Sequence, residues 1–193
     1  MKKKILAGVL ACILLIGVGV GGTLAWLTTD TAPVVNTFTV GNIDITLEET
    51  TTDYKMVPGN TIDKNPKVTV LSGSEASWLF VKIEESANLD DFIVYAVEDG
   101  WTPLDDVDGV YYREVPATTQ DTPFDVIGNK GVDGMGTFVA NKVLVKETVT
   151  KAMMDAIEKA PATAPTLTFT AYACQKDNIV SAADAWAKIN PST

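Results

Sequence analysis

The chain has 193 residues, of which 15 are lysine or arginine and 25 are aspartate or glutamate, and its formal net charge is −10. This acidity argues against nucleic acid or an anionic membrane as a partner, because both repel a negatively charged protein. The sequence contains no histidine, which excludes serine–histidine and cysteine–histidine nucleophile pairs as well as zinc sites of the HExxH type.

The N-terminus has the three parts of an export signal. Lysines occupy positions 2–4, and no charged residue follows between Ile5 and Leu27. A basic head, an apolar stretch and an exit of small residues are typical of a secretory signal peptide. We therefore predict a signal peptide over residues 1–25, with a signal-peptidase cleavage site formed by Thr23, Ala25 and Trp26.

A retained membrane anchor is the alternative to cleavage. The apolar run exceeds the roughly 7–15 residues of a usual signal core and reaches the about 20 residues that span a bilayer. Four glycines between positions 17 and 22 weaken a helix next to the cleavage site, which suits a peptidase that binds extended chain. We therefore expect cleavage before Trp26 and a secreted product, extracellular or at the cell surface, without membrane contact.

The cleaved product is expected to be one domain over residues 26–193. Loss of the three N-terminal lysines leaves twelve basic residues against 25 acidic ones, a net charge of −13. Cys174 is then the one remaining cysteine, so no intramolecular disulfide can form, and its place in an apolar run predicts a buried thiol. Cys12 lies inside the signal, where we interpret it as an apolar residue rather than as a lipidation site.

Most of the chain after the signal alternates between apolar and polar residues or runs apolar at strand length. The run 78–83 is apolar on both faces, which predicts a strand at the centre of a sheet. Between 37–40 and 43–47 the apolar positions change parity at Gly41-Asn42, which predicts a β-bulge. The remaining expected strands are 67–71, 92–97, 110–115 in a hairpin with the segment from Trp101, 124–127, 138–145 and 167–172.

Two helices interrupt this β pattern. Thr150 can cap a helix over 151–159 that groups Met153, Met154 and Ile157 on one side. Ser181 and Asp184 form a capping pair for a shorter helix that ends near Ile189. Short strands with two small helices in loops predict an all-β fold, a jelly-roll-like β-sandwich preceded by the N-terminal signal helix.

Sites for metals, cofactors or catalysis have little support in the sequence. The turn at Asp105–Gly109 contains a D-x-D-G fragment of a calcium loop, but the flanking ligand positions hold Leu104 and Val115, so we interpret it as a solvated acidic turn. A hydrolase that uses carboxylates alone is the remaining enzymatic alternative. We therefore expect no enzymatic activity, no catalytic or metal site and no cofactor.

Several segments resemble the TasA/camelysin family of exported proteins of Gram-positive bacteria. The most specific are Gly21 to Asp30 and Asn36 to Leu47, and softer aromatic and turn patterns recur at 57–60, 77–82, 99–101, 109–112, 167–175 and 182–186. The resemblance implies cleavage by a dedicated ER-type signal peptidase. It also implies a jelly-roll domain of the cell surface or biofilm matrix and assembly into fibres. Camelysin-type members are labelled metalloproteases, but the absence of histidine argues against that activity here.

In fibres of this kind, the resemblance implies that an N-terminal strand of one subunit completes the sheet of its neighbour. Strand addition satisfies the exposed edge groups of both subunits, and a contact that does not close on itself produces a filament. The predicted donor strand lies between Trp26 and Leu47, with apolar positions Val35, Phe38, Val40, Ile43, Ile45 and Leu47. The alternatives are pairing of this segment within its own subunit, and a monomeric adhesin or ligand-binding module that uses the loops between 117 and 136.

Overall fold

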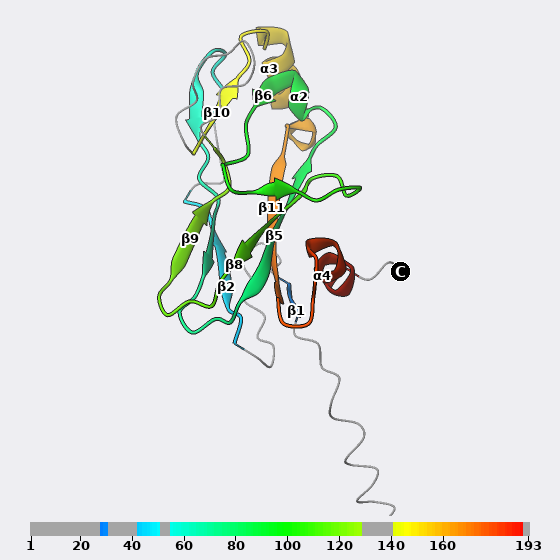
Figure 1. Cartoon of the computed structure of the whole chain (residues 1–193). Helices are drawn as coiled ribbons and strands as arrows, with labels where there is room; N and C mark the ends of the chain where they lie inside the picture. Colours follow the sequence, from blue (N-terminus) through cyan, green and yellow to red (C-terminus); the bar gives the residue numbers. More distant parts are fainter. Residues whose placement is uncertain (1–27, 31–41, 51–54, 129–140, 191–193) are drawn as a thin grey trace, which may run out of the picture.

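The computed structural model describes residues 28–30, 42–50, 55–128 and 141–190, and Figure 1 shows that most of the regular structure is β-strand. The strands are β1 (Thr28–Asp30), β2 (Ile45–Glu48), β3 (Thr61–Asp63), β4 (Lys67–Val70), β5 (Ser77–Glu85), β6 (Ile93–Val94), β7 (Thr102–Pro103), β8 (Val110–Val115), β9 (Thr122–Asp125), β10 (Lys142–Val145) and β11 (Leu167–Gln175). The helices are α2 (Leu89–Phe92), α3 (Lys151–Lys159), the 3-10 turn η1 (Pro161–Thr163) and α4 (Ala182–Ile189).

The strands form three antiparallel sheets. The largest has the order β1-β11-β5-β8-β7, and two three-stranded sheets have the orders β2-β4-β9 and β3-β10-β6. β5 and β11 pair along their full nine residues, from Leu167 opposite Glu85 to Gln175 opposite Ser77. The prediction of a central strand at 78–83 is confirmed, because β5 lies between β11 and β8.

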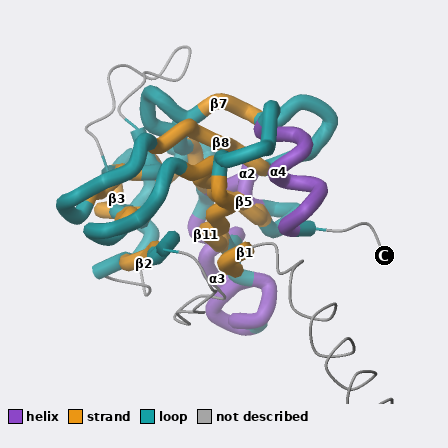
Figure 2. Tube along the Cα trace, turned by 60° about the horizontal axis from the view of Figure 1, so that its bottom comes forward, coloured by secondary structure: helices purple, strands orange, loops and turns teal. Residues whose placement is uncertain are grey.

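Alternate residues of β5 belong to two different cores, because successive side chains of a strand point to opposite faces. Leu79, Val81 and Ile83 lie in the main core, which they share with buried residues of the two smaller sheets. Trp78 and Phe80 lie in a second cluster with Trp186 of α4. The large sheet is therefore covered on one face by the smaller sheets and on the other by α4, and Figures 1 and 2 show α4 on its own side of β5 and β11. This arrangement confirms an all-β sandwich with short helices.

Both predicted helices are present with their predicted caps. The Thr150 hydroxyl accepts a hydrogen bond from the Met153 backbone N–H at 3.3 Å, and the Ser181 hydroxyl accepts one from the Asp184 N–H at 3.1 Å. These bonds satisfy backbone donors that the first helical turn leaves open. The apolar side of α3 is only half-buried against the main core, through Met153, Met154 and Ile157.

The strand predicted over 92–97 is confirmed in part. β6 covers Ile93–Val94 and Val97 forms an isolated bridge with Ile127, whereas Phe92 is the last residue of helix α2. Leu89 and Phe92 are both buried, and their three-residue spacing places them on one side of a helical turn. This burial favours the turn over the strand that the apolar run suggests. The signal helix, the strand at 37–40 and Gly41 of the predicted bulge lie outside the described residues.

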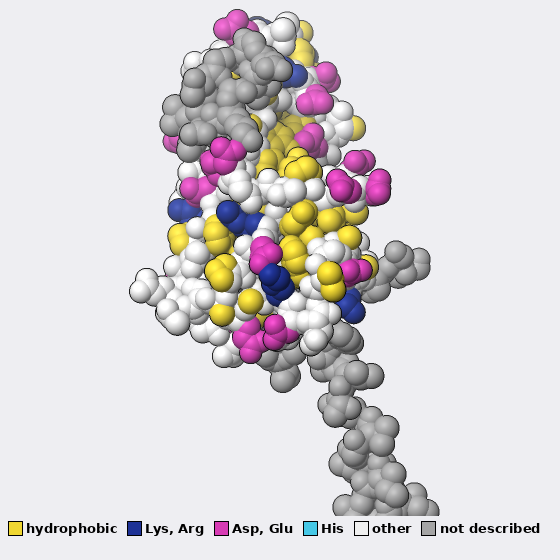
Figure 3. Space-filling model, in the orientation of Figure 1, with side chains coloured by type: hydrophobic (Ala, Val, Ile, Leu, Met, Phe, Trp, Pro, Cys, Tyr) yellow, Lys and Arg dark blue, Asp and Glu magenta, His cyan; other side chains and the backbone are white. Residues whose placement is uncertain are grey.

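The acidity of the chain is visible on the surface. Figure 3 shows scattered patches of aspartate and glutamate side chains on the face seen in Figure 1, with a few lysines and arginines between them. The turn of Asp105, Asp106 and Asp108 is exposed, and among the described residues no group of three or more metal-binding side chains comes together. None of the helices in the described ranges is long and apolar enough to cross a membrane.

Candidate functional site

A cavity of about 630 Å³ opens between the large sheet and the two smaller ones. Its walls include side chains from β2, β3, β10, β11 and α3, which are far apart in the sequence. Apolar side chains of the lining include Leu47, Met56, Ile62, Val143, Ile157 and Phe169. We call this space the inter-sheet cavity. Concave apolar space of this size is typical of sites that bind a ligand or an apolar segment of a partner.

A charged pair forms one wall of the inter-sheet cavity. The Lys64 ammonium lies 2.8 and 2.9 Å from the two carboxylate oxygens of Glu49, and the two side chains are only 11% and 16% exposed. The Lys64 nitrogen also lies 5.3 Å from the centre of the Phe169 ring, a distance at which a cation is attracted to an aromatic face. The ion pair therefore ties the end of β2 to the segment after β3 and to β11.

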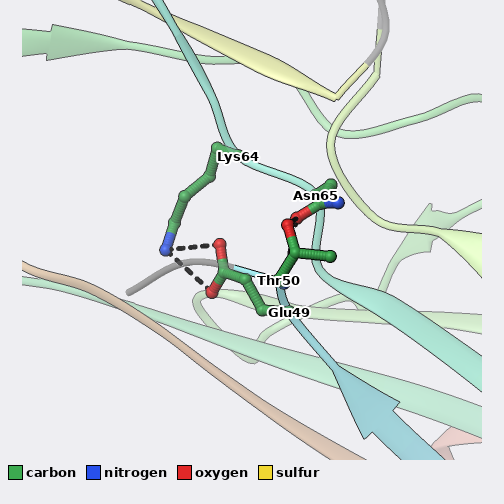
Figure 4. A network of polar contacts seen from close by, with 4 residues as sticks. All are labelled: Glu49, Thr50, Lys64 and Asn65. Carbon is green, nitrogen blue, oxygen red and sulfur yellow. Dashed lines mark hydrogen bonds and ion pairs between the residues drawn. The ribbon is translucent and has the colours of Figure 1, made fainter. Parts of the chain in front are cut away.

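A neutral contact reinforces the same connection. The Thr50 hydroxyl donates to the Asn65 side-chain oxygen at 3.0 Å, and the Thr50 backbone N–H donates to the same oxygen at 3.3 Å. Figure 4 shows both pairs side by side, with Glu49 and Thr50 on one chain segment and Lys64 and Asn65 on the other. The two adjacent pairs hold the cavity wall in one geometry, since each fixes the orientation of the same two segments.

Replacing Glu49 with glutamine tests the structural role of this wall. We expect a loss of about 2 kcal/mol in the free energy of unfolding, because the largely buried Lys64 ammonium loses its carboxylate. Urea unfolding followed by tryptophan fluorescence measures the loss. The matched control is Asp155→Asn, whose partner Lys151 is 85% exposed and whose loss should stay below about 0.5 kcal/mol. Equal losses for the two variants would contradict a special role for the wall.

The structure describes three of the predicted donor positions, Ile43, Ile45 and Leu47. Ile43 and Ile45 are buried in the main core, and Leu47 is half-buried and lines the inter-sheet cavity. In this single chain β2 pairs with β4, with Ile45 opposite Val70. The other predicted site residues, Thr23, Ala25, Trp26, Val35, Phe38 and Val40, lie outside the described residues.

The chain segment nearest the predicted cleavage site that the structure describes is β1. It pairs antiparallel with the C-terminal half of β11, with Thr28 opposite Cys174 and Asp30 opposite Tyr172. Figure 2 shows β1 beside β11 at the edge of the large sheet. Cys174 is buried, as predicted, and burial raises the pKa of its thiol, which keeps it protonated and unreactive.

The inter-sheet cavity was not predicted from the sequence. Its walls come from short segments between residues 47 and 169, and no local pattern marks residues that meet only after the sheets have packed. The sequence alone does not distinguish Lys64 and Glu49 from ordinary surface charges, because each lies between polar residues. The one available signal was the apolar side of α3, of which Ile157 faces the cavity.

Comparison with known proteins gives one match. Residues 1–77 match a protein family described as camelysin metallo-endopeptidase. The matched part contains the predicted signal, the strands from β1 to β4 and the first residue of β5. No curated protein and no solved structure matches the chain.

Proposed function

We propose that the chain, whose residues 1–77 match the camelysin family, is a secreted structural subunit of cell-surface or biofilm-matrix fibres. Subunits join when the N-terminal strand of one completes a sheet of the next. The partners are therefore other copies of the same chain, with a signal peptidase acting during export. While the signal is attached, the donor strand is tethered at the membrane, and cleavage releases it for assembly.

The observation that carries this proposal is the position of β1. It lies at the edge of the large sheet and follows closely after the predicted cleavage site. An edge strand can be exchanged for the same strand of a neighbour, and the exchange keeps every pair of the ladder. Open-ended exchange from subunit to subunit leads to a filament rather than a closed dimer.

The family description supports a second candidate function, that of a metallo-endopeptidase. The complete sequence has no histidine, and within the described ranges no cluster of carboxylates and cysteine forms a metal site. We therefore favour a role without peptidase activity. Incubation of the secreted protein with casein and zinc measures this directly, and zinc-dependent cleavage that a chelator abolishes would establish the enzyme instead.

Deletion of residues 26–36 tests strand donation. We expect the deletion to abolish fibres while the domain remains folded, because it removes β1 but leaves both cores intact. Electron microscopy measures fibres, and circular dichroism with urea unfolding measures folding. The matched comparison is the same deletion variant supplied with a synthetic peptide of residues 26–41, which should bind and raise its stability. Normal fibres from the deletion variant would refute donation by this segment.

A further inference from the structure

The single arginine of the chain lies on the inner face of the large sheet. Arg113 is in β8 between Tyr111 and Val115, and the side chains of these two residues pack in or against the main core. Alternate residues of a strand point to the same face of a sheet, so the Arg113 side chain also points between the sheets. β8 therefore directs a permanently charged guanidinium into a layer of apolar side chains.

Two aromatic rings and a glycine hold the guanidinium in place. Its central carbon lies 4.0 Å from the centre of the Phe124 ring and 5.1 Å from that of the Trp101 ring, which are distances of cation–π contacts. A Cβ on Gly100 would lie 2.6 Å from a terminal nitrogen of Arg113, so the glycine leaves the space that the guanidinium occupies. These contacts do not use the N–H donors, which remain available to other partners.

Within the described ranges, no hydrogen bond or ion pair to the Arg113 guanidinium is present. The nearby carboxylates have other partners, since Glu98 accepts a hydrogen bond from the Asp99 N–H at 3.0 Å and Glu114 pairs with Lys176. Burial lowers the pKa of Arg113, and the charge of Glu98 opposes this only in part. The half-buried cation thus lacks the bonded counter-charge that offsets its removal from water.

A hollow of about 430 Å³ opens beside the guanidinium. It is lined by Arg113, Phe124 and the loop of residues 116–120, and we call it the Arg113 hollow. Its volume lies within the roughly 300–1,000 Å³ of small-molecule sites. Thr119 and Gln120 are exposed in the loop, and their hydroxyl and amide groups can both donate and accept hydrogen bonds. The hollow therefore combines one cation with groups that can bind the hydroxyls of a ligand.

A carboxylate is the ligand group that suits this arrangement. The guanidinium fork can bind both oxygens of a carboxylate through parallel hydrogen bonds. A doubly charged phosphate suits it less, because Glu114 also lines the hollow and Glu98 lies near the guanidinium. The net charge of −10 repels polyanions, but it opposes a single carboxylate only weakly, since charges more than about 8 Å away are screened at physiological salt.

We propose that the Arg113 hollow binds a sugar acid, with its carboxylate on the Arg113 guanidinium and its hydroxyls on Thr119 and Gln120. The carboxylate supplies the counter-charge that Arg113 lacks, and the loop selects a hydroxylated ligand over a simple organic acid. The Arg113 hollow shares no lining residue with the inter-sheet cavity. The inference therefore stands or falls independently of strand donation and fibre assembly.

Nuclear magnetic resonance of the secreted protein tests this site directly. Because the chain has a single arginine, the Arg113 Nε–H gives one arginine side-chain peak in a ¹⁵N-labelled sample. We expect sodium glucuronate to shift this peak saturably and to bind about tenfold more tightly than sodium acetate, because two further hydrogen bonds contribute roughly that factor. Glucose, which lacks the carboxylate, should leave the peak in place.

The same titration provides the results that would overturn the proposal. A shift that sodium chloride reproduces at equal concentration would be an effect of ionic strength and would remove the site. Equal affinities for glucuronate and acetate would remove the sugar acid, because the loop would then contribute nothing. An Arg113 peak that glucuronate does not move would remove both.

Arg113→Gln and Lys151→Gln form a matched pair of variants, since each removes one positive charge. By calorimetric titration with glucuronate, we expect Arg113→Gln to weaken binding at least about tenfold, because charge-assisted hydrogen bonds are lost. Lys151→Gln should bind normally, since Lys151 is 85% exposed on α3. Equal weakening in both variants would reduce the site to an effect of net charge. The titration of the unsubstituted protein decides the question even if Arg113→Gln does not fold.

Discussion

Replacing Gly109 with alanine is expected to lower the free energy of unfolding by about 3 kcal/mol or more. Gly109 has a φ of +71°, which costs an L-residue roughly 1–2 kcal/mol. A Cβ at this position would also overlap the backbone oxygen of Ile83 in β5. The Ile83 N–H donates to the Gly109 oxygen at 2.7 Å, so relief of the overlap breaks the pairing of β5 with the start of β8.

Gly73→Ala is the matched control for this prediction. Gly73 has a similar φ of +87°, but a Cβ there would meet no atom within 4 Å. Its substitution should therefore cost only the conformational part, roughly 1–2 kcal/mol. Urea unfolding of both variants gives the two losses side by side. If they are equal, close packing of Gly109 against β5 does not contribute to stability.

Replacing Phe80 with alanine should cost about 3–5 kcal/mol, the usual range for removal of a buried aromatic side chain. Phe80 is fully buried on the α4 face of β5. Its ring lies 5.3 Å from that of Trp186 and 6.4 Å from that of Tyr112. The substitution leaves a hole between the large sheet and α4, so α4 should also lose protection from amide hydrogen exchange.

Val180→Ala provides the control for the Phe80 variant. Val180 precedes the capping residue of α4 but is 91% exposed, so its truncation should change the free energy of unfolding by less than about 0.5 kcal/mol. A double substitution of Phe80 and Trp186 then measures the ring contact itself, for which we expect a coupling of about 0.5–1.5 kcal/mol. A Phe80 loss close to that of Val180 would mean that α4 contributes little to the fold.

Local patterns predicted the fold where a single short-range rule decides the structure. Thr150 and Ser181 mark the starts of α3 and α4 because their hydroxyls satisfy open backbone donors. The doubly apolar run at 78–83 predicted a central strand, since only such a strand has a core on each face. The family resemblance is confirmed over residues 1–77.

Features that depend on packing between distant segments could not be predicted. Phe92, the first residue of an expected strand, ends helix α2 instead, because Leu89 and Phe92 are both buried in the main core. The inter-sheet cavity and the Glu49–Lys64 pair arise where β2, β3 and β11 meet. Local propensity and hydrophobic periodicity report on neighbouring residues only, so they cannot predict contacts between these distant strands.

Electron microscopy of the secreted protein over a range of concentrations tests the fibre proposal most directly. N-terminal sequencing of the same sample establishes whether the chain begins at Trp26. We predict fibres whose number grows with concentration and which are absent when residues 26–36 are deleted. A correctly cleaved, folded protein that remains monomeric at high concentration would contradict the account and favour a monomeric adhesin or ligand-binding module.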